Sequence, residues 1–100
     1  MAKEKTKRLD KLMDKIAYGM YLDGEKLFEK GKIDEAINWL GLPHAHFKNK
    51  GNNYGVSLCR DLLRKKGYNP ISLELNYEEN LEHLKNLEEI MKNHYTVSTN

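Results

Sequence analysis

The sequence is poor in cysteine and has no long apolar run. Its single cysteine, Cys59, cannot form a disulfide within the chain, which agrees with a reducing compartment. No apolar stretch approaches the roughly 20 residues that a helix needs to cross a bilayer, and the opening MAKEKTKRLDKL lacks the apolar core of a signal peptide. We therefore expect a cytoplasmic protein without a membrane partner.

Recognisable catalytic and metal-binding patterns are also lacking. No serine or cysteine lies in a nucleophile motif, and Cys59 falls on the apolar face of its predicted helix. His44 and His46 offer two metal ligands, and Cys59, His83 and His94 are further candidates. However, two helical positions two residues apart point to different sides, and no paired cysteine or acidic ligand motif stands nearby. We expect no enzyme, no metal site and no cofactor.

Length and apolar spacing together predict the fold class. One hundred residues suit one domain with a modest core, and apolar residues recur at intervals of three and four along most of the chain. We predict a mostly α protein: a small single-domain helical bundle of four to five helices, spanning residues 1–100 and frayed at 1–5 and 96–100. At most one short strand pair is expected, and the pattern allows a homodimer through the C-terminal helix.

Glycines and proline punctuate the predicted elements. A first helix over residues 6–30 ends at Gly31, and Gly24 on its apolar face either lets another helix come close or breaks the segment. A second helix from Ile33 stops at a Gly41-Leu42-Pro43 turn, and a third follows the Gly/Asn loop at 51–55. Apolar residues then alternate with polar ones over 71–77, which predicts a strand without an evident pairing partner.

The stretch GEKLFEKGKIDEAINWL, residues 24–40, resembles the middle of a tetratricopeptide repeat. Gly24, Gly31 and Ala36 have the spacing at which that family places its small residues. The large residue usual before the first glycine is replaced by Asp23, and no second copy follows. The resemblance implies an antiparallel helix pair and a protein-binding surface.

The overlapping stretch DEAINWLGLPHAHF, residues 34–47, resembles the helix-turn-helix of small excisionase-type DNA-binding regulators. Ala36, Leu40-Gly41-Leu42 and Phe47 match the residues that set two helices across a tight turn in that family. The resemblance implies that a recognition helix starts at Pro43, with His44, Ala45, Lys48 and Asn49 facing outward. A departure is that Gly51-Asn52-Asn53 limits this helix to about two turns.

The segment after this helix is strongly basic. Residues 48–70 hold six lysines and arginines against one acid, whereas residues 71–100 hold two against six. We predict DNA binding through residues 33–50 and the basic stretch 48–60, and the loop at 51–57 offers a phosphate or nucleotide site as an alternative. The residues assigned to nucleic-acid or anion binding are His44, His46, Lys48, Asn49, Lys50, Asn52, Asn53, Tyr54 and Arg60.

A protein-binding adaptor or inhibitor is the competing function. Aromatic residues anchor many protein interfaces, and Trp39, Phe47 and Tyr68 are the candidates here, with Tyr54. Salt separates the two classes, because contacts to phosphates weaken steeply as salt rises. We therefore expect a small non-enzymatic regulatory protein whose partner is either nucleic acid or a larger protein.

Overall fold

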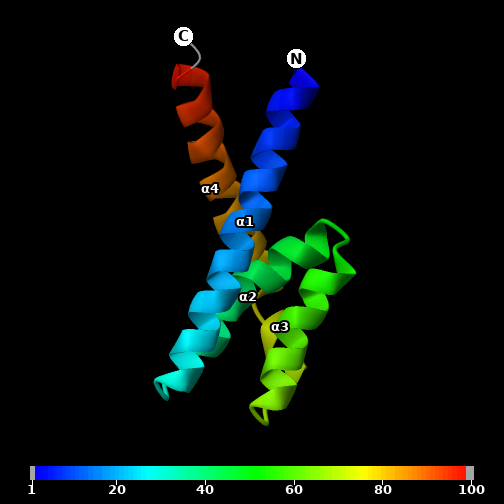
Figure 1. Cartoon of the computed structure of the whole chain (residues 1–100), viewed down its shortest axis with the longest axis vertical. Helices are drawn as coiled ribbons and strands as arrows, with labels where there is room; N and C mark the ends of the chain where they lie inside the picture. The colour runs from blue at the N-terminus through cyan, green and yellow to red at the C-terminus, as the bar shows by residue number, and fades with distance from the viewer. Residues whose placement is uncertain (1, 99–100) are drawn as a thin grey trace.

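Four α-helices and one short 3-10 helix make up the part of the chain that the structure describes. A computed structural model describes the backbone of residues 2–98 and the side chains of residues 8–93. The elements follow in the order α1 (Ala2–Glu29), α2 (Ile33–Asn49), α3 (Asn53–Lys65), η1 (Pro70–Glu74) and α4 (Tyr77–Ser98). No strand occurs between residues 2 and 98 (Figure 1). The predicted small, mostly helical bundle is confirmed.

Helix α2 is the centre of the arrangement. It packs against α1, α3, η1 and α4, and its buried residues include Ala36, Leu40, Ala45 and Phe47. Figure 1 shows α3 running in the same direction as the second half of α1, while the start of α1 and the end of α4 extend away from the other helices. A site built on α2 can therefore draw residues from every other element.

The turn predicted at Gly41-Leu42-Pro43 is wrong, because α2 is continuous from Ile33 to Asn49. Gly41 marks a close approach of α4: a Cβ there would lie 2.6 Å from the amide nitrogen of Asn80. Pro43 is fully buried inside the helix. Packing on both sides of this segment outweighs the cost of an interior proline, about 3 kcal/mol.

The strand predicted over residues 71–77 is also wrong. This segment is the 3-10 helix η1 followed by a turn into α4. Pro70 occupies its first turn, and the Asn69 side chain accepts a hydrogen bond from the backbone N–H of Ile71, which favours a helical start. Only Leu73 is buried, while Ile71 and Leu75 are exposed. The alternation of apolar residues therefore arises from one buried side chain, Leu73, between two exposed ones, Ile71 and Leu75.

Other sequence-based boundaries are confirmed. Gly31, with φ +78°, follows α1, and Gly67 follows α3. Helix α1 passes through Gly24 without a break, and a Cβ there would lie 2.5 Å from Leu40, so this glycine allows the close α1–α2 contact. The helical backbone reaches Ala2 and Ser98, into the ends expected to fray; Met1 and residues 99–100 lie outside the described residues.

Two clusters of buried residues form the core. The larger joins α1, α2, α3 and η1, and the smaller joins the first half of α1, α2 and α4 around Met13 and Leu84. The members of the larger cluster are Ala17, Phe28, Ala36, Leu40, Phe47, Cys59, Leu62, Leu63 and Leu73.

No helix among the described residues is long and apolar enough to cross a membrane.

Candidate functional site

The outward face predicted for a recognition helix is largely buried. His44 and Ala45 are 0% exposed and His46 is 3% exposed, so the expectation that His44 and Ala45 face outward is wrong. The physical reason is the missing turn: α2 continues through Pro43, and these positions then face η1, α3, α1 and α4. The two histidines consequently have structural surroundings that the sequence did not reveal.

On its side toward α1, α2 is held by two acid–base pairs. His46 Nε2 lies 2.7 Å from an Asp14 carboxylate oxygen, and Lys50 Nζ lies 3.6 Å from Asp10. The partners are spaced by four residues on each helix, so the two pairs form consecutive rungs between α1 and α2. On this side of α2, each basic side chain is therefore paired with one carboxylate of α1.

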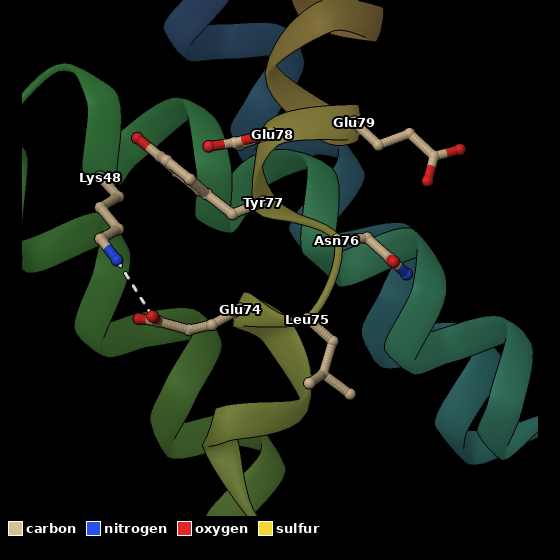
Figure 2. Close-up of a pocket in the computed structure, with 7 residues that line it drawn as sticks. All are labelled: Lys48, Glu74, Leu75, Asn76, Tyr77, Glu78 and Glu79. Carbon is tan, nitrogen blue, oxygen red and sulfur yellow. Dashed lines mark hydrogen bonds and ion pairs between the residues drawn. The ribbon is translucent and has the colours of Figure 1, made fainter.

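On its side toward η1, α2 contributes His44 and Lys48, one helical turn apart. Lys48 Nζ donates to a Glu74 carboxylate oxygen at 3.1 Å and lies 4.8 Å above the centre of the Tyr77 ring. Figure 2 shows the Lys48 and Glu74 side chains pointing toward each other, with the Tyr77 ring beside Lys48. The charges of Lys48 and Arg60 act on both His44 and Glu74. We call these four residues the η1 cluster.

Two members of the η1 cluster have buried nitrogen atoms that lack a hydrogen-bond partner among the described residues. Among the described side chains, neither ring nitrogen of His44 nor Nε of Arg60 has one, and each of these atoms is inaccessible to solvent. An unpaired buried polar group costs about 1–3 kcal/mol, and such groups are few in native proteins. The η1 cluster therefore contains buried polar atoms that the described residues leave unpaired.

The charges of the η1 cluster act on one another. Burial lowers the pKa of His44, Arg60 and Lys48 lower it further, and Glu74 opposes them. The hydrogen bond from Lys48 lowers the pKa of Glu74, and the charges of Lys48, His44 and Arg60 act in the same direction. His44 is thus kept neutral, while Glu74 is kept ionised.

An open pocket adjoins the η1 cluster. It has a volume of about 480 Å³ and lies where η1 passes into α4. In Figure 2, Leu75, Asn76 and Glu79 point away from Lys48, so the side of the pocket nearest the η1 cluster is formed by Lys48, Glu74 and Tyr77. Glu78 completes the lining.

The predicted Gly/Asn loop is shorter than expected, because α3 begins at Asn53. The Asn52 side chain accepts a hydrogen bond from the Gly55 N–H and caps this helix. Gly55 lies against the Phe47 ring, where a Cβ would overlap it. Asn49, Asn53 and Tyr54 are exposed, as a binding role requires.

The aromatic interface candidates differ in exposure. Phe47 is buried against α3, so its assignment to an interface is wrong, although its place as a buried hydrophobe is confirmed. Trp39 and Tyr68 are partly exposed, and the Tyr68 ring stacks on Phe28 at 6.0 Å. Tyr68 is therefore tied to the end of α1.

Sequence reasoning singled out Tyr54 but missed the exposed side chains Tyr18 and Leu22 of α1. Tyr18, Leu22 and Tyr54 are exposed, and Tyr54 shows 74% of its surface. The Tyr18 and Tyr21 ring centres are 5.9 Å apart. Burial raises the pKa of Tyr21, and the charge of Glu25 acts in the same direction. Helix α3, which carries Tyr54, contacts α1. We call Tyr18, Tyr21, Leu22 and Tyr54 the aromatic surface; its sequence signal was the i, i+4 pair Tyr18 and Leu22 beside the apolar stripe.

The remaining reactive side chains are structural or exposed. Cys59 is fully buried, which confirms its place in the core, and burial raises the pKa of its thiol to about 12. His83 Nε2 lies 3.8 Å from Glu79 on the surface of α4. No group of three or more metal-ligating side chains occurs among the described residues, and His94 lies outside them.

Comparison with known proteins adds no relative. The chain matches no protein-family model, no curated protein and no solved structure.

Proposed function

We propose that the protein is a protein-binding adaptor or inhibitor that uses the aromatic surface of α1 and α3. The observation that supports this most is the position of Tyr18, Leu22 and Tyr54, three large exposed side chains gathered on two neighbouring helices. Tyrosine supplies a large contact area at little cost in side-chain entropy and is enriched at interface hot spots.

The helical hairpin supports the same proposal. Helices α1 and α2 form the antiparallel pair that the tetratricopeptide resemblance implies, and Gly24 lets Leu40 pack closely between them. A third helix, α3, packs against α2 and also contacts α1 (Figure 1). Two neighbouring helices of this kind offer a rigid surface on which a partner can dock without refolding the protein.

DNA binding through residues 33–50 stays a prediction, with less support. Its candidate bases are occupied within the protein: Lys48 bonds Glu74 and Lys50 pairs with Asp10. A phosphate would have to compete with both carboxylates. The aromatic surface meets no such competitor among the described ion pairs.

Retention from an extract of the native host tests the proposal. We would immobilise the wild-type protein, the double variant Tyr18→Ala/Tyr54→Ala, and the control Leu75→Ala. This control truncates an apolar side chain elsewhere that is about as exposed as Tyr54. We expect a protein partner that binds wild type and control alike and is retained at moderate salt. The double variant should bind at least about 30-fold more weakly, since a hot-spot aromatic contributes about 2 kcal/mol or more.

Two results would reject the proposal. One is equal retention of the partner by the double variant with an unchanged circular-dichroism spectrum. The other is retention of nucleic acid alone, released between low and moderate salt, which would favour DNA binding instead.

A further inference from the structure

The outward face of α1 carries a row of side chains whose charge changes sign along the helix. The row lies opposite the buried stripe that includes Leu9, Met13 and Ala17, and all its members are exposed except Glu25, which is half-buried. Its members recur at alternating intervals of four and three residues, the spacing of a helix face that pairs with another helix. The row, which we call the α1 seam, consists of Lys11, Lys15, Tyr18, Leu22, Glu25 and Glu29.

The charged ends of the α1 seam have no partner within the part of the chain that the structure describes. Neither its two lysines nor its two glutamates form an ion pair there. The aspartates in the same half of α1 as the lysines are paired with His46 and Lys50 of α2. One end of the seam is therefore basic and unpaired, and the other is acidic and unpaired.

We propose that the α1 seam pairs antiparallel with the α1 seam of a second copy of the chain, in a register centred midway between Tyr18 and Leu22. Twofold symmetry then repeats each contact with the two copies exchanged, so that every member of the seam meets a complementary one. A parallel pair would instead place lysine against lysine and glutamate against glutamate, which disfavours it. The facing residues of the two copies are Lys11 with Glu29, Lys15 with Glu25, and Tyr18 with Leu22.

The centre and the ends of the α1 seam contribute differently. Tyr18 and Leu22 are 49% and 37% exposed, and covering them supplies the apolar area that gives affinity. Exposed ion pairs add little affinity, but charges that match across an interface fix its register and orientation. A single pair of helices is a small interface, so we expect a reversible dimer.

This inference rests on the proposed use of the aromatic surface for protein binding, and it names a second copy as one occupant. Tyr18 and Leu22 belong both to that surface and to the α1 seam. A different protein partner must therefore displace the second copy before it binds. Self-pairing would keep the aromatic surface covered until such a partner is present.

Sedimentation equilibrium of the full chain, without host extract, tests the pairing. Between about 10 and 500 μM protein, we expect a reversible equilibrium of monomer and dimer. The double variant Lys11→Glu/Lys15→Glu places like charges at both ends of the interface and should raise the dissociation constant of the dimer at least about tenfold. The matched control Lys65→Glu/Lys66→Glu makes the same change of charge at exposed positions at the end of α3 and should raise it less than about twofold.

Exchanging the charges at both ends tests the antiparallel register. The fourfold variant Lys11→Glu/Lys15→Glu/Glu25→Lys/Glu29→Lys has the net charge of the wild type and again sets opposite charges against each other. It should dimerise within about threefold of the wild-type affinity. A mixture of the double variants Lys11→Glu/Lys15→Glu and Glu25→Lys/Glu29→Lys should likewise form a mixed dimer, which tests the pairing if the fourfold variant does not fold. Circular dichroism shows which variants are folded.

Three results would overturn the pairing. They are a wild type that stays monomeric over this range, a double variant that dimerises as tightly as the wild type, and a folded fourfold variant that stays monomeric. None of them affects retention of a host protein by the aromatic surface. Failure of the self-pairing is therefore distinguishable from failure of the proposed function.

Discussion

The two sides of α2 that carry histidine differ in how their charges are matched. Toward α1, His46 and Lys50 each meet an aspartate, one turn apart. Toward η1, His44 and Lys48 have the same spacing, but Glu74 is the one carboxylate between them and Arg60 is added. Toward α1, each of these basic side chains is paired with a carboxylate. Toward η1, buried nitrogen atoms of His44 and Arg60 have no hydrogen-bond partner among the described residues.

The difference shows that burial of a histidine does not by itself reveal its role. His44 and His46 are two residues apart in one helix and almost equally buried. What separates them is the supply of acceptors from the neighbouring element: a long helix with two aspartates in one case, and a short 3-10 helix with one glutamate in the other. The role of a buried histidine therefore depends on its hydrogen-bond partners, which come from distant parts of the chain.

The largest effect on the side of α2 toward η1 is expected from replacing Leu73, the buried residue of η1. Leu73 is the buried residue of that element, so Leu73→Ala should lower the free energy of unfolding by about 2–5 kcal/mol. Leu75→Ala, two residues on at a 77% exposed position, should change it by less than about 0.5 kcal/mol. Urea denaturation followed by Trp39 fluorescence measures both. Similar losses in the two variants would mean that η1 is not held by Leu73.

Replacing each histidine by leucine sharpens the comparison directly. His46→Leu should cost about 1–2 kcal/mol, because the hydrogen bond to Asp14 is lost while that carboxylate keeps its hydration. His44→Leu should be neutral or stabilise by up to about 1 kcal/mol, since it removes polar atoms that have no partner. The measurement is again the free energy of unfolding in urea. A larger loss for His44→Leu would indicate that water or another group pairs with this ring.

Acidification gives the smallest effect. Burial lowers the pKa of His44 below its usual 6.5, so the unfolded chain takes up this proton more readily than the folded protein does. This difference in proton uptake costs no folding stability well above pH 6.5. The cost grows as the pH falls below 6.5, so the free energy of unfolding should decline from pH 7.5 to 5. The Glu74 contribution, with its lowered pKa, is lost only below about pH 4.5. The wild type should lose more stability over this range than His44→Leu, and parallel curves would contradict the prediction.

Much of the fold was predictable from local patterns. Apolar spacing and the glycines at 24, 31 and 67 placed the α1–α2 hairpin and the end of α3, because these signals act within a few residues. The break at Gly41-Leu42-Pro43 and the strand at 71–77 failed for a common reason. In each case, packing against a distant element, α4 for Gly41 and the α2–α3 core for Leu73, outweighed the local preference.

The candidate sites were less predictable than the fold. Lys48 and Arg60 were identified as basic residues near a binding site, but the sequence contained no signal that Glu74 would lie between them. His44 was assigned for the wrong reason, as a surface residue. The aromatic surface depends on the contact of α3 with α1, a tertiary relationship that helix periodicity does not report.

The buried thiol of Cys59 gives this protein a natural reporter of its own opening. A side chain that is 0% exposed, with a pKa of about 12, cannot be alkylated while α3 stays against α2. Alkylation therefore requires a transient opening that separates α3 from α2. Its rate is proportional to the fraction of molecules in this open state. Partner binding that stabilises the packing of α3 would slow this reaction, so a single native residue can report on binding at the aromatic surface without any label in the contact surface.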